Sequence, residues 1–168
     1  YRGAATLADN TPPTAGAMRV LGAFGFSVDA GADLDGDGYL DAVIGAPDYD
    51  ATSHPSAGRA TVYLGGSPLT FPAAWSYVGT QTDGNAGACV SAVGRTAVSG
   101  TALSVIGVGA PNEDYTHLLV CRIPPCGTAT DIAAGRFYAV RSDGATHTVQ
   151  SSPAGGNASA HAGWSTAN

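Results

Sequence analysis

An internal repeat constrains the fold of this 168-residue chain more than any other feature of its sequence. The tripeptide Gly-Ala-Pro occurs at residues 45–47 and again at residues 109–111, so that the two copies lie 64 residues apart. Each copy ends an apolar segment and is followed by a variable loop, a Gly-Arg pair and another apolar segment. Because self-similarity at a fixed period indicates a repeat architecture, we expect each unit to bury its faces against its neighbours.

Each unit contains four short segments with the composition of β-strands. Gly, Ala, Thr, Ser and Val dominate the chain, which contains no lysine and few strong helix formers. The segments lie at residues 24–28, 42–47, 58–64 and 75–78 in the first unit and at residues 86–91, 104–111, 135–140 and 147–150 in the second. Four short antiparallel strands over roughly 60–75 residues are typical of a propeller blade. We therefore expect an all-β fold made of β-propeller blades of four antiparallel strands.

The repeat also predicts how the chain is divided. Residues 1–21 would be the end of a preceding blade, residues 22–84 and 85–152 two complete blades, and residues 153–168 the start of a further blade. A short stack of blades leaves open apolar faces. The chain is accordingly interpreted as a partial propeller cut from a longer protein, or as a homo-oligomer in which other copies of the chain complete the propeller.

An acidic segment, Asp33–Asp41, connects the first two predicted strands of the first unit. Carboxylates occupy its positions 1, 3, 5 and 9, and two glycines separate them. Hard oxygen ligands at this density favour Ca²⁺, and the ion would turn the mutual repulsion of the carboxylates into attraction. The sequence therefore predicts one calcium site, with four side-chain ligands and the Tyr39 carbonyl as a fifth: Asp33, Asp35, Asp37, Tyr39 and Asp41.

The segment is not a helix-loop-helix calcium site. Such a site needs an acid at position 12, which is Ile44 here, and the residues after Asp41 have the pattern of an apolar strand. We expect Leu34 and Leu40 to point away from the ion and to anchor the loop to a core. The alternative interpretation is an acidic, solvated turn.

The first unit contains Phe24-Gly25, then the acidic segment and then Gly45-Ala46-Pro47. In the order and spacing of these three parts, the unit resembles an FG-GAP repeat of the integrin alpha-subunit β-propeller type. It implies that calcium loops lie on the lower rim of a propeller and brace the blade, while loops on the opposite face contact ligands.

The second unit departs from this pattern. It keeps Gly109-Ala110-Pro111, but Gly87 has no Phe before it and residues 93–101 contain no acid. We therefore expect the second blade to bind no calcium and to carry a plain turn in place of the acidic loop.

Three cysteines occur in the chain. Cys121 and Cys126 bracket a short loop with a Pro pair, for which we predict a local disulfide bond and hence an oxidising compartment. A zinc site at these two residues is disfavoured, because the two-residue spacing and a second ligand pair are missing. Cys89 is expected to be a small buried hydrophobic residue.

The loops that follow the Gly-Ala-Pro units are the candidate ligand-binding surface. The second of them, residues 112–134, is 13 residues longer than the first, residues 48–57. Loops inserted per repeat on one face often form the binding face, although a tolerated insertion explains the length equally well. The candidate contact residues in the two loops are Tyr49, Asp50, His54, Glu113, Asp114, Tyr115 and His117.

Composition narrows the class of function. The net charge is −6 with no basic cluster, which disfavours nucleic-acid binding, and no apolar run reaches the length of a membrane span. No histidine pair has metal-ligand spacing and no nucleophile elbow occurs. We expect an extracellular, secreted or cell-surface module that adheres non-catalytically to a protein or glycan or assembles with other copies. The alternatives are a carbohydrate-binding propeller and the propeller part of a secreted hydrolase.

Overall fold

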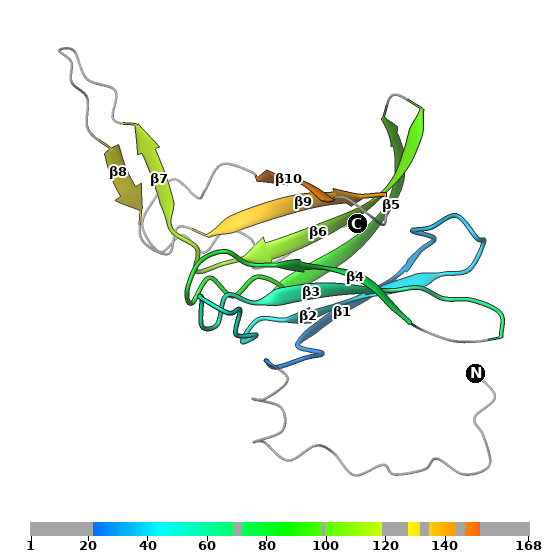
Figure 1. Ribbon diagram of the computed structural model, residues 1–168, viewed down its shortest axis with the longest axis horizontal. Coiled ribbons are helices and arrows are strands. Elements are labelled where there is room, and N and C mark those ends of the chain that lie inside the picture. The colour runs from blue at the N-terminus through cyan, green and yellow to red at the C-terminus, as the bar shows by residue number, and fades with distance from the viewer. Residues whose placement is uncertain are drawn as a thin grey trace, which may run out of the picture.

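A computed structural model describes residues 22–68, 72–98, 100–118, 128–131, 135–143 and 147–151. This part of the chain contains ten β-strands and no helix. The strands form two four-stranded antiparallel sheets and one separate hairpin (Figure 1). The expected all-β fold with blades of four antiparallel strands is confirmed. Among the described residues no helix is long and apolar enough to cross a membrane.

The first sheet is a simple meander. It consists of β1 (Ser27–Ala32), β2 (Asp41–Ala46), β3 (Arg59–Tyr63) and β4 (Ala73–Val78), in the order β1-β2-β3-β4. Val43 pairs with Val62, and Val62 pairs with Trp75, so that these three side chains lie on the same face. Successive residues of a strand point to opposite faces, and this face is the buried one.

The second sheet repeats this meander. It consists of β5 (Cys89–Val98), β6 (Thr101–Ala110), β9 (Arg136–Ser142) and β10 (His147–Ser151), in the order β5-β6-β9-β10. A hairpin of β7 (Tyr115–Leu118) and β8 (Thr128–Asp131) is inserted between β6 and β9. The insertion that was interpreted as a long loop therefore contains two strands, and β5 and β6 are longer than the short strands expected.

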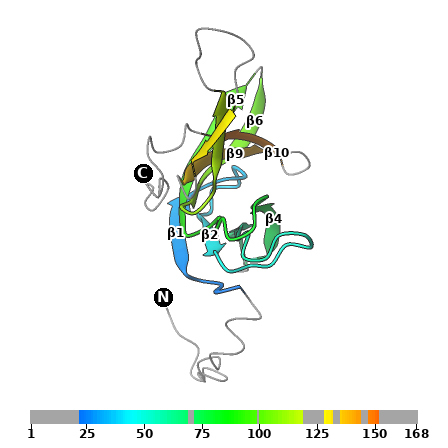
Figure 2. The ribbon, with the colours of Figure 1, turned by 90° about the vertical axis from the view of Figure 1, so that its left-hand side faces the viewer.

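The core lies between the two sheets, which face each other in both views (Figures 1 and 2). Trp75, Tyr77 and Tyr138 are buried in it, and Cys89 is buried as expected. Phe26, by contrast, is 62% exposed. The core residues are Leu34, Val43, Ala60, Val62, Trp75, Tyr77, Ala86, Val90, Ala92, Ile106, Val108, Ala110, Tyr138 and Val140.

The glycines that recur in the two units have structural roles in both blades. Gly25 and Gly87 both have φ of +87°, and each donates its N–H to the glycine of the Gly-Ala-Pro unit in its own blade, Gly45 at 3.0 Å and Gly109 at 2.9 Å. Gly45 also lies directly against the backbone carbonyl of Gly87 in the next blade. A side chain at Gly45 would overlap that carbonyl, so this glycine allows the two sheets to approach.

Candidate functional site

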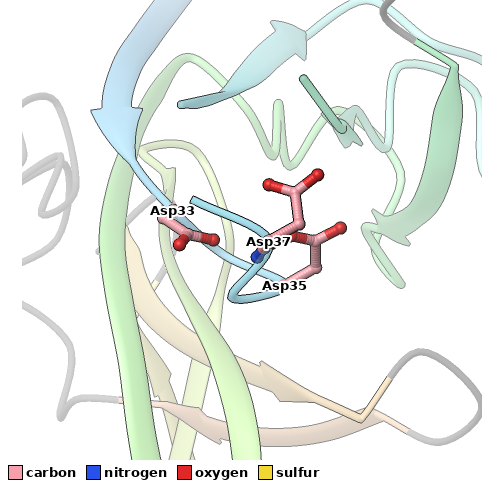
Figure 3. A group of neighbouring side chains, drawn as sticks. All are labelled: Asp33, Asp35 and Asp37. Atoms are coloured by element: carbon pink, nitrogen blue, oxygen red, sulfur yellow. Dashed lines mark hydrogen bonds between the residues drawn. The ribbon is translucent and has the colours of Figure 1, made fainter. Parts of the chain in front are cut away.

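The acidic loop, residues 33–40, joins β1 to β2 at the end of the first sheet. It brings together the side chains of Asp33, Asp35 and Asp37 (Figure 3). One carboxylate oxygen from each residue lies within 4.8 Å of those from the other two. Asp35 and Asp37 are exposed and Asp33 is half-buried, so the cluster faces solvent.

The carboxylates also accept hydrogen bonds from the backbone of their own loop. Asp33 accepts the N–H of Gly36 at 2.5 Å and the N–H of Gly38 at 3.0 Å. Asp35 accepts the N–H of Asp37 at 3.1 Å, and Asp37 accepts that of Tyr39 at 2.8 Å. Gly36 and Gly38 have φ of +88° and +89°, which glycine adopts without steric cost. The acids and glycines of the motif therefore set the shape of the loop before any ligand is considered.

Asp41 lies apart from the other three acids. It is fully buried, and its two oxygens accept the N–H groups of Leu34 at 2.5 Å and Gly65 at 2.8 Å. These bonds tie the beginning of the loop and the segment after β3 to the beginning of β2. The structure thus brings three of the four predicted carboxylate ligands together, while Asp41 closes the base of the loop.

The pKa values of the clustered acids move in opposite directions. Desolvation acts to raise the pKa of Asp33, but the N–H groups of Gly36 and Gly38 and the positive charge of Arg95 outweigh it, so the pKa lies below its usual value. Desolvation and repulsion from neighbouring carboxylates raise the pKa of Asp35, against the hydrogen bond from the Asp37 N–H. Crowded negative charge of this kind is what a bound cation would neutralise.

The donor set fits a hard divalent cation. Every side chain in the cluster offers carboxylate oxygen, which is the ligand that Ca²⁺ prefers, and the loop carries no imidazole or thiolate ligand. Asp33, Asp35 and Asp37 are the residues that would hold such an ion.

The loop is also part of the contact between the blades. Leu34 is 1% exposed and belongs to the core, and its carbonyl accepts the Ser104 hydroxyl at 2.6 Å. Arg95 of β5 lies against Gly36. The expectation for Leu34 is confirmed, whereas that for Leu40 was wrong, because Leu40 is 62% exposed. Asp41 turns inward to its backbone partners, and the preceding residue in an extended chain then faces outward.

Residues 24–63 match the family model of the FG-GAP repeat. This segment is similar to an FG-GAP repeat, and it makes up 40 of the 168 residues of the chain. It begins at Phe24, contains the whole acidic loop and ends at the last residue of β3. No match to the chain was found among curated proteins.

The first candidate ligand loop of the FG-GAP repeat lies at the other end of β2 from the acidic loop. Tyr49 stacks on Arg59, with the guanidinium carbon 4.2 Å from the ring centroid. Asp50 is exposed and accepts the N–H of Ser56 at 2.8 Å. His54 is half-buried and exchanges two backbone hydrogen bonds with Ala51, each of 3.1 Å. These three predicted contact residues thus lie on one compact turn.

Glu113 lies elsewhere than expected. It was predicted to be a ligand-contact residue on a loop, but it is fully buried, and the Tyr138 hydroxyl donates a hydrogen bond to its Oε2. Its Oε1 accepts no hydrogen bond from the described residues. Burial raises the pKa of Glu113, with the Tyr138 hydrogen bond and the charge of Arg136 acting against the rise. Burial and the contact with Glu113 likewise raise the pKa of Tyr138 to about 12.

The repeat explains the burial of Glu113. It follows Gly-Ala-Pro by two residues, as Tyr49 does, and Arg136 follows glycine after the variable loop, as Arg59 does. In the first blade, the ring of Tyr49 therefore contacts the arginine of the Gly-Arg pair. In the second blade, the carboxylate of Glu113 lies near the equivalent arginine. Both residues contribute to the joint between turn and sheet, and Glu113 presents no surface to a ligand.

The remaining predicted residues lie in or near the insertion. The backbone of Asp114 exchanges two hydrogen bonds with the Gln81 side chain, of 2.8 and 3.1 Å. Tyr115 and His117 are on β7, paired with Asp131 and Ala129, and their side chains lie outside the described part. Cys121 and Cys126, predicted to form a disulfide, also lie outside the described residues.

Asn85 was not identified from the sequence. Its amide donates to the Pro47 carbonyl at 3.1 Å, and its carbonyl oxygen accepts the Asn112 amide at 2.6 Å. It thereby joins the Gly-Ala-Pro turns of the two blades. No motif identifies this residue, since only its position between two repeated turns gives it a role.

Proposed function

We propose that the chain is a non-catalytic binding or assembly module on an integrin-like β-propeller that one calcium ion braces. The observation that carries this proposal is the convergence of three carboxylates within 4.8 Å in the loop between β1 and β2 of an FG-GAP repeat. A bound ion would supply the positive charge that these acids lack among themselves. Asp33, Asp35 and Asp37 are the proposed side-chain ligands, with Asp41 and the Tyr39 carbonyl completing the set.

We assign calcium a structural role. The loop is attached to the core through Leu34 and to the second blade through Ser104, so an ion that fixes the loop also fixes the contact between the blades. Recognition is assigned to the turns after the Gly-Ala-Pro units, which lie at the other ends of β2 and β6. Asp50 and His54 on the first turn and Asp114 in the second blade are the proposed contact residues of the described part.

The proposed partner is a protein or a glycan outside the cell, or other copies of the chain. Assembly with neighbouring blades is supported by large apolar side chains on both sheets, including Val28 at 60% and Val93 at 55% exposed. A neighbouring blade of a longer chain or of another copy would cover them. The proposed extracellular location rests on the predicted Cys121–Cys126 disulfide.

Thermal melting with and without calcium tests the proposed brace. At a calcium concentration about 100-fold above the dissociation constant, linkage should stabilise the folded chain by roughly 2.7 kcal/mol. Asp35→Asn should remove about half of this gain or more, whereas Asp83→Asn, at an exposed position remote from the loop, should retain it. Equal melting temperatures of the wild type with calcium and with chelator would refute the brace.

Partner screening tests the binding role. The chain should be retained on protein or glycan arrays, and Asp50→Ala or His54→Ala should weaken retention without changing the melting temperature. The mass in solution, measured at micromolar concentration, should exceed that of one chain if copies assemble. Turnover of a glycoside or ester substrate without array binding would instead favour the hydrolase alternative.

A further inference from the structure

The second blade places a positive charge against the acidic loop of the first. Ser27–Asp33 and Cys89–Arg95 each span the same number of residues from the start of the first strand of a blade, so Arg95 stands at the repeat position of Asp33. The first acidic residue of the loop in the first blade is therefore replaced by a positively charged residue in the second blade.

The strands of the second blade carry this arginine to the loop. β5 and β6 are ten residues long, whereas β1 and β2 have six, and the β5–β6 ribbon extends past its sheet at the end where the acidic loop lies (Figure 1). The pairing register shifts between Ala92 and Gly94, and Gly94 has φ of +122°. This irregularity changes the course of β5 immediately before Arg95.

The side chain of Arg95 reaches the acidic loop. Its guanidinium lies against the Cα of Gly36, and its charge acts on the Asp33 carboxylate. Arg95 and Asp35 both line a cleft of about 170 Å³ between the loop and the second blade, and Ser104 and Trp75 line the same cleft. Ser104 also holds the loop, because its hydroxyl donates a hydrogen bond to the Leu34 carbonyl.

We propose that Arg95 is a resident counter-charge that lowers the affinity of the acidic loop for divalent cations and so sets the concentration at which the loop is filled. This inference rests on the proposed calcium site. A guanidinium and a metal ion that share one group of carboxylates repel each other, and the repulsion grows with the charge of the ion. Arg95 is exposed, so solvent and salt reduce the effect without abolishing it.

The test compares cation binding to the full chain and to two variants. Arg95→Gln removes the charge and should tighten calcium binding by about three- to tenfold at low ionic strength. Arg95→Lys keeps the charge and should bind calcium within about twofold of the wild type. Terbium, a trivalent probe of calcium sites, should gain more from Arg95→Gln than calcium does, because it carries the larger charge.

Salt distinguishes the charge effect from a change of loop shape. The ratio of dissociation constants between wild type and Arg95→Gln should shrink as the ionic strength rises from about 0.01 to 1 M, since the Debye length falls from about 30 to 3 Å. Unchanged or weaker calcium binding by Arg95→Gln would overturn the inference while leaving the proposed site intact. A ratio of dissociation constants that does not change with ionic strength would do the same. A wild-type chain that binds neither ion would overturn both.

Discussion

Two leucines lie within the acidic segment, and the structure gives them opposite environments. Leu34 is 1% exposed between the blades, and Leu40 is 62% exposed. Replacing a fully buried leucine by alanine removes its apolar contacts and leaves a cavity, which costs about 3 kcal/mol. For a chain of this length, that loss lowers the melting temperature by about 6–12 °C. Leu40→Ala removes the same atoms from an exposed site and should change the stability by about 0.5 kcal/mol or less.

Urea unfolding followed by tryptophan fluorescence measures both variants, since Trp75 lies in the same core as Leu34. The measurement should be made in chelator, so that any difference in calcium affinity does not enter the comparison. Leu34→Ala should lower the urea midpoint with little change in slope.

Equal effects of the two substitutions would refute the reasoning, and so would a larger effect of Leu40→Ala. Either result would mean that the acidic loop is not held between the blades through Leu34. The assignment of the loop to the joint between blades, on which the structural role of calcium depends, would then be lost.

Three further predictions concern polar side chains within and between the blades. The raised pKa of Glu113 means that the folded chain favours its neutral form, so the stability that it contributes is fully present below about pH 4.5 and is lost as the pH rises through the raised value. Glu113→Gln should therefore be more stable than the wild type at pH 7 and equal to it near pH 4, as measured by melting across that range. Asp41→Ala should lose about 2–4 kcal/mol in urea unfolding, because two buried N–H groups lose their acceptor, whereas Asp50→Ala should lose less than about 1 kcal/mol. Asn85→Ala should lower the melting temperature and increase hydrogen exchange at the N–H of Asn112; unchanged exchange there would contradict its role as a bridge.

Much of the fold could be predicted because the repeat supplied two copies of one pattern. Each of the eight blade strands overlaps a segment predicted from the sequence, although the first strand of each blade begins three residues after the predicted start. The clustering of Asp33, Asp35 and Asp37 follows from local spacing in one loop. Such features depend on residues close together in the chain.

The errors arose where contacts with residues outside the local segment decide the environment of a side chain. Glu113 appeared to be a loop acid, but Tyr138, which lies 25 residues away, buries it in a hydrogen bond. Leu40 appeared to be an anchor, but the inward turn of Asp41 leaves it outside. Arg95 and Asn85 acquire their roles only when the second blade packs on the first, which no local spacing reveals.

Calorimetric titration of the chelator-treated chain with calcium tests the central claim most directly. We predict that one ion binds per chain in the wild type, and that Asp35→Asn weakens binding at least about tenfold while Asp83→Asn leaves it unchanged. Two results would contradict the proposal that the acidic loop binds the calcium ion that braces this blade. One is a wild-type chain that takes up no calcium, and the other is an Asp35→Asn variant that binds calcium as tightly as the wild type.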